Sequence, residues 1–276
     1  MSNQVDEPGR PDAGLRPRVT TSWCGPLREN RAFLELGRLL ADPVLRGHGV
    51  PAGDGRAVLL LPGYLAGDGS LSILAGFLRR IGYQPVFTGI RFNNGCAEKY
   101  YGRITDALRE HTRTGRQVAV VGHSRGGHYA KALGASHPED VSHVVCLGSG
   151  LDYALDVHPV TRISAATSRR LLARPRSARE EIGCLTEQCA CELAQAYRRP
   201  YAGGPLLTSI YTRGDGCVRW TSCLADYANC VEVPGSHIGL AFNRHAYRAV
   251  AHALAVPVPV PPAGHMAPDP GGTPCR

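Results

Sequence analysis

The segment GHSRGG, residues 122–127, carries one serine between glycines and directly follows the apolar run QVAVV. Ser124 has Gly122 two residues before it and Gly126 two residues after it. Side chains at those two positions would collide with a neighbouring strand and helix, so the pattern predicts a strained bend that exposes the serine Oγ. A hydroxyl in such a place is typical of nucleophilic catalysis when a base activates it. The alternative is a tight bend between two buried elements without chemistry.

The elements that must position this serine alternate along the chain. Apolar runs typical of strands occupy residues 57–61, 84–90, 117–123, 142–148, 205–212 and 230–233. Helical patterns lie between and after them, around residues 70–82, 97–114, 126–137 and 239–255. Because the strands are apolar on both faces and separated by helices, the sequence predicts the α/β class, with a mostly parallel central sheet and helices on both faces.

Taken with this order of elements, GHSRGG resembles the nucleophile elbow of the α/β-hydrolase superfamily, in its lipase and esterase branch. The resemblance extends from about residue 30 to residue 255. It implies the α/β-hydrolase fold and a triad in the order serine, acid, histidine. It implies no cofactor, because acyl transfer to water through a serine ester needs none. Relatives that attack with aspartate are set aside, since the elbow here carries Ser124.

Two further residues match the superfamily's triad. Asp215 follows the strand predicted at 205–212 and stands between two glycines. His237 follows the next predicted strand, at 230–233, and precedes a helix. The resemblance therefore makes Ser124 the nucleophile, His237 the base and Asp215 the acid that orients the imidazole.

Other histidines and aspartates compete for these roles. His123 adjoins the serine, but consecutive residues point in different directions, so we expect its ring to pack beside the sheet. His245 and His252 fall inside the last predicted helix. Asp152 follows the fourth predicted strand, a second location from which some superfamily members supply the acid, and Asp226 is another candidate.

The loop at residues 59–70, LLLPGYLAGDGS, follows the first predicted strand. By resemblance, the backbone N–H groups of Tyr64 and Arg125 form the oxyanion hole, and Gly63 gives the loop its turn. The alternatives are a plain connector and a phosphate-binding loop. Phosphate binding is disfavoured, because the loop lacks both the P-loop lysine and the spacing of a dinucleotide site, while Asp68 would repel an anion. The Arg125 side chain could bind an anionic part of the substrate or pair with a carboxylate.

The net charge of +8 raises the question of a nucleic-acid partner. The cations are almost all arginines scattered in ones and twos, and the lysines are Lys99 and Lys131. No basic face, stacking aromatic residues or binding motif accompanies them, so we predict no nucleic-acid partner.

Ten cysteines could form disulfides or bind a metal. The groups at Cys184, Cys189, Cys191 and at Cys217, Cys223, Cys230 lack paired CxxC spacing, so no zinc site is predicted. Without an export signal most are expected to be buried thiols. A local disulfide, such as Cys223 with Cys230 or one involving Cys191, stays open.

The predicted organisation is a disordered leader at 1–22, one α/β-hydrolase domain at 23–255 and a proline-rich tail at 256–276. The domain opens with a short amphipathic helix, whose apolar residues are Leu27, Phe33, Leu34, Leu36, Leu39 and Leu40. Residues 151–204 break the alternation and read as a lid-like helical insertion. Its apolar residues suit an acyl chain or simply pack on the sheet: Leu171, Leu172, Ile182, Leu185, Leu193 and Tyr197.

No run of about 18 apolar residues occurs, and no apolar stretch follows the charged N-terminus, so the sequence predicts neither a transmembrane segment nor a secretory signal. The expected location is the cytoplasm. The expected function is an esterase or lipase acting on a small-molecule or lipid-like ester. The alternatives are an acyltransferase or thioesterase with the same triad, and a non-enzymatic binding protein on this fold.

Overall fold

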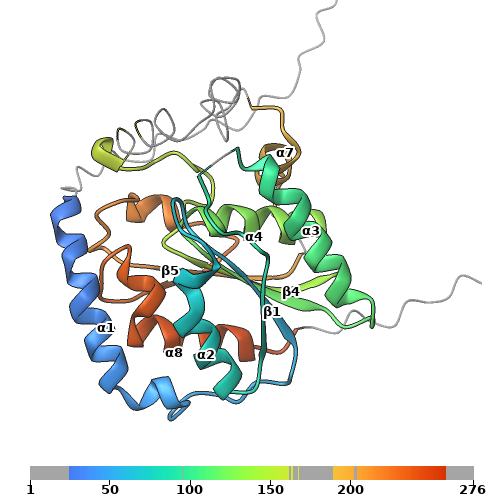
Figure 1. Cartoon of the computed structure of the whole chain (residues 1–276). Coiled ribbons are helices and arrows are strands. Elements are labelled where there is room, and N and C mark those ends of the chain that lie inside the picture. Colours follow the sequence, from blue (N-terminus) through green and yellow to red (C-terminus); the bar gives the residue numbers. More distant parts are fainter. Residues whose placement is uncertain are drawn as a thin grey trace, which may run out of the picture.

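Six parallel strands form the centre of the computed structural model, in the order β2-β1-β3-β4-β5-β6 (Figure 1). The structure describes residues 25–94, 96–161, 163, 167, 189–201 and 204–258. The strands are β1 (Ala57–Leu61), β2 (Gln84–Phe87), β3 (Val118–His123), β4 (Val141–Leu147), β5 (Leu206–Tyr211) and β6 (Asn229–Glu232). Each strand lies within an apolar run of the sequence or within one residue of it, and the predicted parallel sheet is confirmed.

The helices connect the strands as the alternating pattern predicts. They are α1 (Arg31–Ala41), α2 (Ser72–Arg80), α3 (Glu98–Thr112), α4 (Arg125–Ser136), α7 (Glu192–Arg198) and α8 (Arg244–Ala255). Short 3₁₀ helices are η1 (Pro26–Asn30), η2 (Pro43–Arg46), η3 (Asp68–Leu71), η4 (Trp220–Cys223) and η5 (Gly239–Phe242). The helix expected at 239–255 is thus divided, because Asn243 begins α8 by accepting hydrogen bonds from the backbone N–H groups of the first turn.

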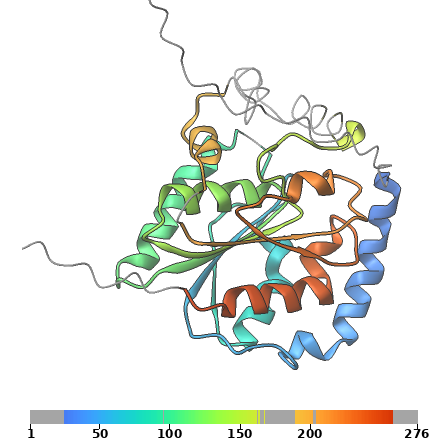
Figure 2. The ribbon, with the colours of Figure 1, turned by 180° about the vertical axis from the view of Figure 1, so that it is seen from behind.

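Both faces of the sheet are covered. Alternate residues of β1 point to opposite sides, so Val58 and Leu60 join the core with α2 and α8. Leu59 and Leu61 join the core with α3 and α4. Figures 1 and 2 show α3, α4 and α7 on one side of the sheet and α2 and α8 on the other. Burial on both faces explains why the strands read as continuous apolar runs.

Helix α1 is present where the sequence predicts it, but most of its large apolar side chains do not face the core. Leu39 is fully buried, whereas Phe33 is 80% and Leu34 64% exposed. Leu40 is exposed as well, as is Leu27 on η1, and the carboxylate side chain of Glu35 is buried instead. The inward side of this helix packs against the loop that precedes α8, where polar backbone groups need acceptors.

The ends of the predicted insertion, residues 151–204, lie partly within the described residues. In the described part, Leu193 and Tyr197 on α7 are buried against α4, so they pack on the domain. Leu171, Leu172, Ile182 and Leu185 lie outside the described residues. The predicted leader lies outside them entirely, and the tail is described only up to residue 258.

Every helix in the part of the chain that the structure describes is too short or too polar to cross a bilayer.

Candidate active site

The bend between β3 and α4 holds Ser124 at a positive φ, with φ of 53° and ψ of −120°. A non-glycine residue with positive φ is uncommon and stores strain. The glycines around it are required by close approach. A Cβ on Gly122 would lie 2.3 Å from the backbone of Gly126, and a Cβ on Gly126 would lie 2.0 Å from the backbone oxygen of Leu61. The strained bend predicted from the glycine spacing is therefore present.

The loops after β3, β5 and β6 bring Ser124, Asp215 and His237 together. Oγ of Ser124 lies 2.9 Å from Nε2 of His237, and Nδ1 of His237 lies 2.7 Å from Oδ2 of Asp215. Because a carboxylate can only accept a hydrogen bond, Nδ1 carries the proton and Nε2 of the neutral ring is free to take one from the hydroxyl. Parallel strands end at one edge of a sheet, which is why residues so distant in sequence meet.

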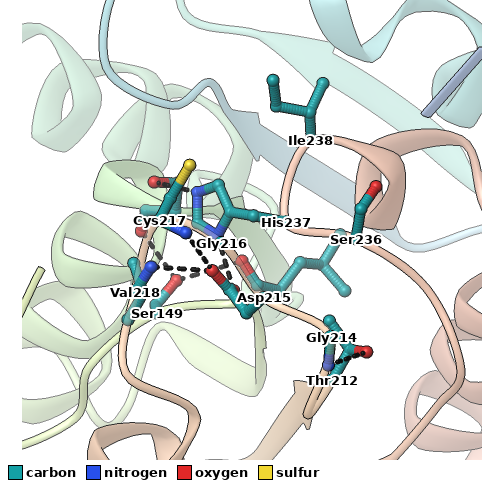
Figure 3. A network of polar contacts seen from close by, with 12 residues as sticks. Ser149, Thr212, Gly214, Asp215, Gly216, Cys217, Val218, Ser236, His237 and Ile238 are labelled. Carbon is teal, nitrogen blue, oxygen red and sulfur yellow. Dashed lines mark hydrogen bonds and ion pairs between the residues drawn. The ribbon is translucent and has the colours of Figure 1, made fainter. Parts of the chain in front are cut away.

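The carboxylate of Asp215 is held by its own loop (Figure 3). Its Oδ1 accepts from the backbone N–H groups of Cys217, at 2.8 Å, and Val218, at 2.7 Å. These bonds occupy one oxygen and leave the other directed at the imidazole. The side chain is almost fully buried, so its charge acts with little screening by water.

The backbone of Ser124 is fixed from the end of β4. The N–H of Ser124 donates to the backbone oxygen of Leu147 over 2.8 Å. The hydroxyl of Ser149 donates to the backbone oxygen of Ser124 over 2.6 Å. Sequence reasoning missed Ser149, since one serine next to a glycine-rich turn carries no distinguishing signal.

Two buried histidines next to each other have opposite electrostatics. Burial alone would lower the pKa of His237, but the carboxylate of Asp215 and then that of Glu29 outweigh it and raise the pKa above 6.5. Burial, with His237 nearby, lowers the pKa of His123 to about 4. The two ring centroids are 5.2 Å apart, and Nε2 of His123 donates to the backbone oxygen of His237 over 2.9 Å. His123 thus supports the loop of His237.

Glu29, in η1, also reaches this site. Its Oε1 accepts from the N–H of Gly216 at 2.9 Å and from the N–H of His237 at 3.1 Å. Sequence reasoning missed it. The partners are 187 and 208 residues away in the chain, and no local pattern reports contacts over such separations.

The competing residues point elsewhere. Asp152 accepts from Nζ of Lys131 at 3.3 Å and from the hydroxyl of Tyr227 at 2.5 Å. Asp226 is exposed, and so is His252 on α8. His245, also on α8, accepts from the side chain of Arg244.

The loop after β1 touches the serine bend. A Cβ on Gly63 would lie 3.2 Å from Cβ of Ser124, so this loop and the bend are in direct contact. Asn93 donates from Nδ2 to the backbone oxygen of Pro62 over 2.9 Å and thereby holds the loop. Tyr64 is in this loop and Arg125 begins α4, and the Arg125 guanidinium stacks over the Tyr64 ring at 5.5 Å from its centroid.

Glu29, Asp215 and Cys217 bring possible metal-ligand atoms within 4.8 Å of one another in the described part of the chain. Both carboxylates already accept backbone hydrogen bonds. Burial, with the two neighbouring carboxylates, raises the pKa of the Cys217 thiol to about 12, so the thiolate that a metal needs is disfavoured. The chemistry of the donor set therefore does not favour a metal. Cys223 and Cys230 are free thiols, so the disulfide considered between these two residues is absent, whereas one involving Cys191 stays a prediction.

No protein-family model matches the chain, and no curated protein matches it by sequence. Among solved structures, the chain is similar to the metagenomic carboxyl esterase MGS0156, at 13% identity and a TM-score of 0.53, over 82% of this chain and 91% of that one. It is also similar to the monoacylglycerol lipase of Paleococcus ferrophilus, at 14% identity and a TM-score of 0.49, over 74% and 96% of the two chains. A third is polyneuridine aldehyde esterase, at 13% identity and a TM-score of 0.46, over 72% and 98%. The sheet order and the first of these similarities together show that the chain has the α/β-hydrolase fold.

Proposed function

We propose that this chain is a serine hydrolase that cleaves carboxylic esters. The observation that carries the proposal is the continuous hydrogen-bond chain from Oγ of Ser124 through the imidazole of His237 to the carboxylate of Asp215. The hydroxyl stands on strained backbone at the start of a helix, the arrangement that serine nucleophiles of this fold adopt. The raised pKa of the imidazole suits a general base working near neutral pH.

The reaction follows from these positions. As Oγ of Ser124 attacks the ester carbonyl carbon, its proton passes to Nε2 of His237, and Asp215 stabilises the imidazolium that forms. The imidazolium then gives this proton to the oxygen of the leaving alcohol as the ester C–O bond breaks. The alcohol is released, and an acyl-enzyme remains. A water molecule gives a proton to the same nitrogen and attacks the acyl carbon. The imidazolium then returns that proton to Oγ of Ser124 as the bond between Oγ and the acyl carbon breaks, and the products are the carboxylic acid and the free serine.

The negative charge on the tetrahedral intermediate needs donors beside the nucleophile. We assign the backbone N–H groups of Tyr64 and Arg125 to this role. The contact of the Tyr64 loop with the serine bend supports the assignment. Loss of one such donor costs about 3 kcal/mol of barrier in comparable enzymes. The Arg125 side chain stacks on the Tyr64 ring and thereby joins the two halves of the proposed hole.

An apolar or lipid-like ester is the substrate class that the surroundings favour. Exposed apolar side chains stand on the loops that follow the strands at this edge: Leu65, Phe92, Tyr153, Leu155 and Ile238. Such a rim favours an uncharged acyl chain over a highly charged substrate. The insertion at 151–204 leaves the sheet at this edge, and we propose that it covers the bound ester as a lid.

The experiment is active-site labelling with a fluorophosphonate probe. We expect the wild-type chain to be labelled and Ser124→Ala to be unlabelled and inactive on short-chain esters while keeping its circular dichroism spectrum. Ser142→Ala is the matched control. Ser142 lies at the start of β4, away from the edge of the sheet where the strands end, and its hydroxyl donates to the backbone oxygen of Val118. A folded wild-type chain that is inert to the probe, or a Ser124→Ala chain that still hydrolyses esters, would refute the proposal. Product analysis with competing alcohols and thioesters separates hydrolysis from acyl transfer.

A further inference from the structure

The N-terminal 3₁₀ helix η1 places a carboxylate against two loops of the site. Glu29 is only 7% exposed. Its Oε1 accepts from the N–H of Gly216 and from the N–H of His237, and its Oε2 accepts from the N–H of Ile238 over 2.7 Å. Hydrogen bonds to a charged acceptor are stronger than neutral ones, so three of them on one buried group form a rigid joint.

The three donors belong to two loops. Gly216 follows the triad acid, Asp215, in the loop after β5. His237 and Ile238 belong to the loop after β6. A single side chain therefore ties the loop of the acid to the loop of the base. A displacement of about 1 Å between catalytic groups can lower the rate about 100-fold. A hydrogen-bonded connection between these two loops therefore bears directly on the distance between acid and base.

The charge of Glu29 needs its own explanation. An uncharged acceptor could satisfy some of these N–H groups, whereas burying a carboxylate is costly. The ionisable groups beside the His237 ring are Asp215, Glu29, His123 and Cys217. Burial keeps His123 and the Cys217 thiol uncharged near neutral pH, so the two carboxylates supply the local charge. Both favour the imidazolium, which is the form that develops in the transition state.

We propose that Glu29 is a positioning residue of the triad, which fixes the acid loop against the base loop and adds a second negative charge for the imidazolium. This inference rests on the proposed function. The reacting groups remain the serine, the histidine and the aspartate, and Glu29 acts through the last two.

A matched control lies on the same segment. Glu35, on α1, is equally buried at 7% exposure and packs against Gly235 and Gly239 on either side of the base. Its Oε2 accepts from the side-chain amide of Asn243 over 2.7 Å, at the start of α8. Glu35 thus stabilises the same region without a hydrogen bond to the N–H of Gly216 or His237.

The experiment compares Glu29→Gln with Glu35→Gln. The glutamine oxygen can still accept two hydrogen bonds, but the amide nitrogen that replaces the other oxygen cannot accept from Ile238. We expect kcat to fall about 10- to 100-fold in Glu29→Gln with KM changed less than about twofold, because geometry and charge act in the chemical step. We also expect the acidic limb of the kcat/KM profile to move down by about half a pH unit or more, since removing a negative charge makes the imidazolium harder to form. Glu35→Gln should keep an acceptor for the side-chain amide of Asn243 and leave the limb in place.

Three results would overturn the inference. One is a folded Glu29→Gln chain that has the wild-type kcat and an acidic limb of kcat/KM at the same pH as in the wild type. Another is a loss of kcat in Glu29→Gln that only follows a loss of its melting temperature. If Glu29→Gln does not fold, hydrogen exchange on the wild type decides, because fast exchange at the amides of Gly216, His237 and Ile238 would exclude the joint.

A readout independent of esterase activity separates this inference from the proposed function. The pKa of the His237 imidazole can be titrated by nitrogen NMR, with His237→Asn used to assign its signals. If the wild type is inert to the fluorophosphonate probe, the proposed function fails. If the wild type is labelled and Glu29→Gln leaves the His237 titration unchanged, only the role of Glu29 fails.

Discussion

Two groups of ionisable side chains, the proposed triad and a second group, lie near α4, and their hydrogen bonds lead to different places. In the triad they lead to the hydroxyl of Ser124. The second group, which we call the lysine cluster, comprises Lys131, Asp152, Tyr197 and Tyr227. Lys131 is 4% exposed, donates to the backbone oxygen of Leu151 over 2.6 Å, and has its Nζ 4.5 Å and 5.3 Å from the Tyr197 and Tyr227 ring centroids.

The triad and the lysine cluster each place a buried basic group beside a carboxylate, although Asp152 is 39% exposed and Asp215 is almost fully buried. Burial lowers the pKa of Lys131, and Asp152 only partly opposes this. In the triad the carboxylates outweigh burial and raise the pKa of His237. In the lysine cluster, Lys131 contacts a carbonyl oxygen and two aromatic rings. In the triad, the last hydrogen bond reaches the half-buried hydroxyl of Ser124, which is held on strained backbone. A buried ion pair thus indicates structure, and it indicates catalysis only where it leads to a reactive group.

The strongest test of this comparison is to replace each of the two aspartates by asparagine and to compare the effects on kcat. Asp215→Asn should lower kcat about 10⁴-fold, because the amide no longer holds the imidazole in its reactive tautomer. Asp152→Asn should change kcat by less than about threefold. Initial rates on one ester, with folding checked by circular dichroism, measure both. Equal losses would show that the lysine cluster belongs to the catalytic machinery.

The pH dependence gives the next largest effect. His237 must be neutral to act as the base, so kcat/KM should fall about tenfold per pH unit on the acid side of its pKa. Because that pKa is raised, the midpoint of the limb should lie above 6.5. His123, with a pKa of about 4, stays neutral over this range and adds no second limb. A midpoint below 6.5 would contradict the balance of burial and carboxylate charge described for the base.

The lysine cluster should affect stability instead of rate. Lys131→Met removes the cation beside Asp152, whose side chain is 39% exposed and can recover part of its hydration. We expect the free energy of unfolding to fall by about 1–2 kcal/mol and kcat to change less than about threefold. Urea denaturation and initial rates measure the two quantities. The double variant with Asp152→Asn should recover part of the stability, and a tenfold loss of kcat would reverse the assignment.

The smallest expected effect is at Tyr197. Its hydroxyl donates to the backbone oxygen of Gly150 over 2.8 Å and lies in the interior between α7 and the end of β4. Tyr197→Phe should lower the free energy of unfolding by about 1 kcal/mol, since one buried carbonyl loses its donor. The midpoint of urea denaturation measures it. No change in the midpoint would mean that water or another donor takes the place of the hydroxyl.

Much of the fold was predictable because its determinants are local. Strands buried on both faces appear as continuous apolar runs, and helices as periodic ones. The bend at Ser124 was predictable for the same reason, since Gly122 and Gly126 are the residues that a close strand–helix approach requires. Helix α1 shows where local reasoning stops. Its pattern predicts a helix correctly, but it does not reveal that the inward face carries Glu35 and leaves Phe33 exposed.

By itself, then, the sequence determined the α/β class, the parallel sheet and the position of the strained serine. Only the tertiary structure decided that Asp152 turns to Lys131, that His123 donates to the backbone oxygen of His237, and that Glu29 accepts from the N–H of His237. The physical reason is separation along the chain. These contacts join residues 21, 114 and 208 positions apart, and their geometry depends on how whole loops pack at one edge of the sheet.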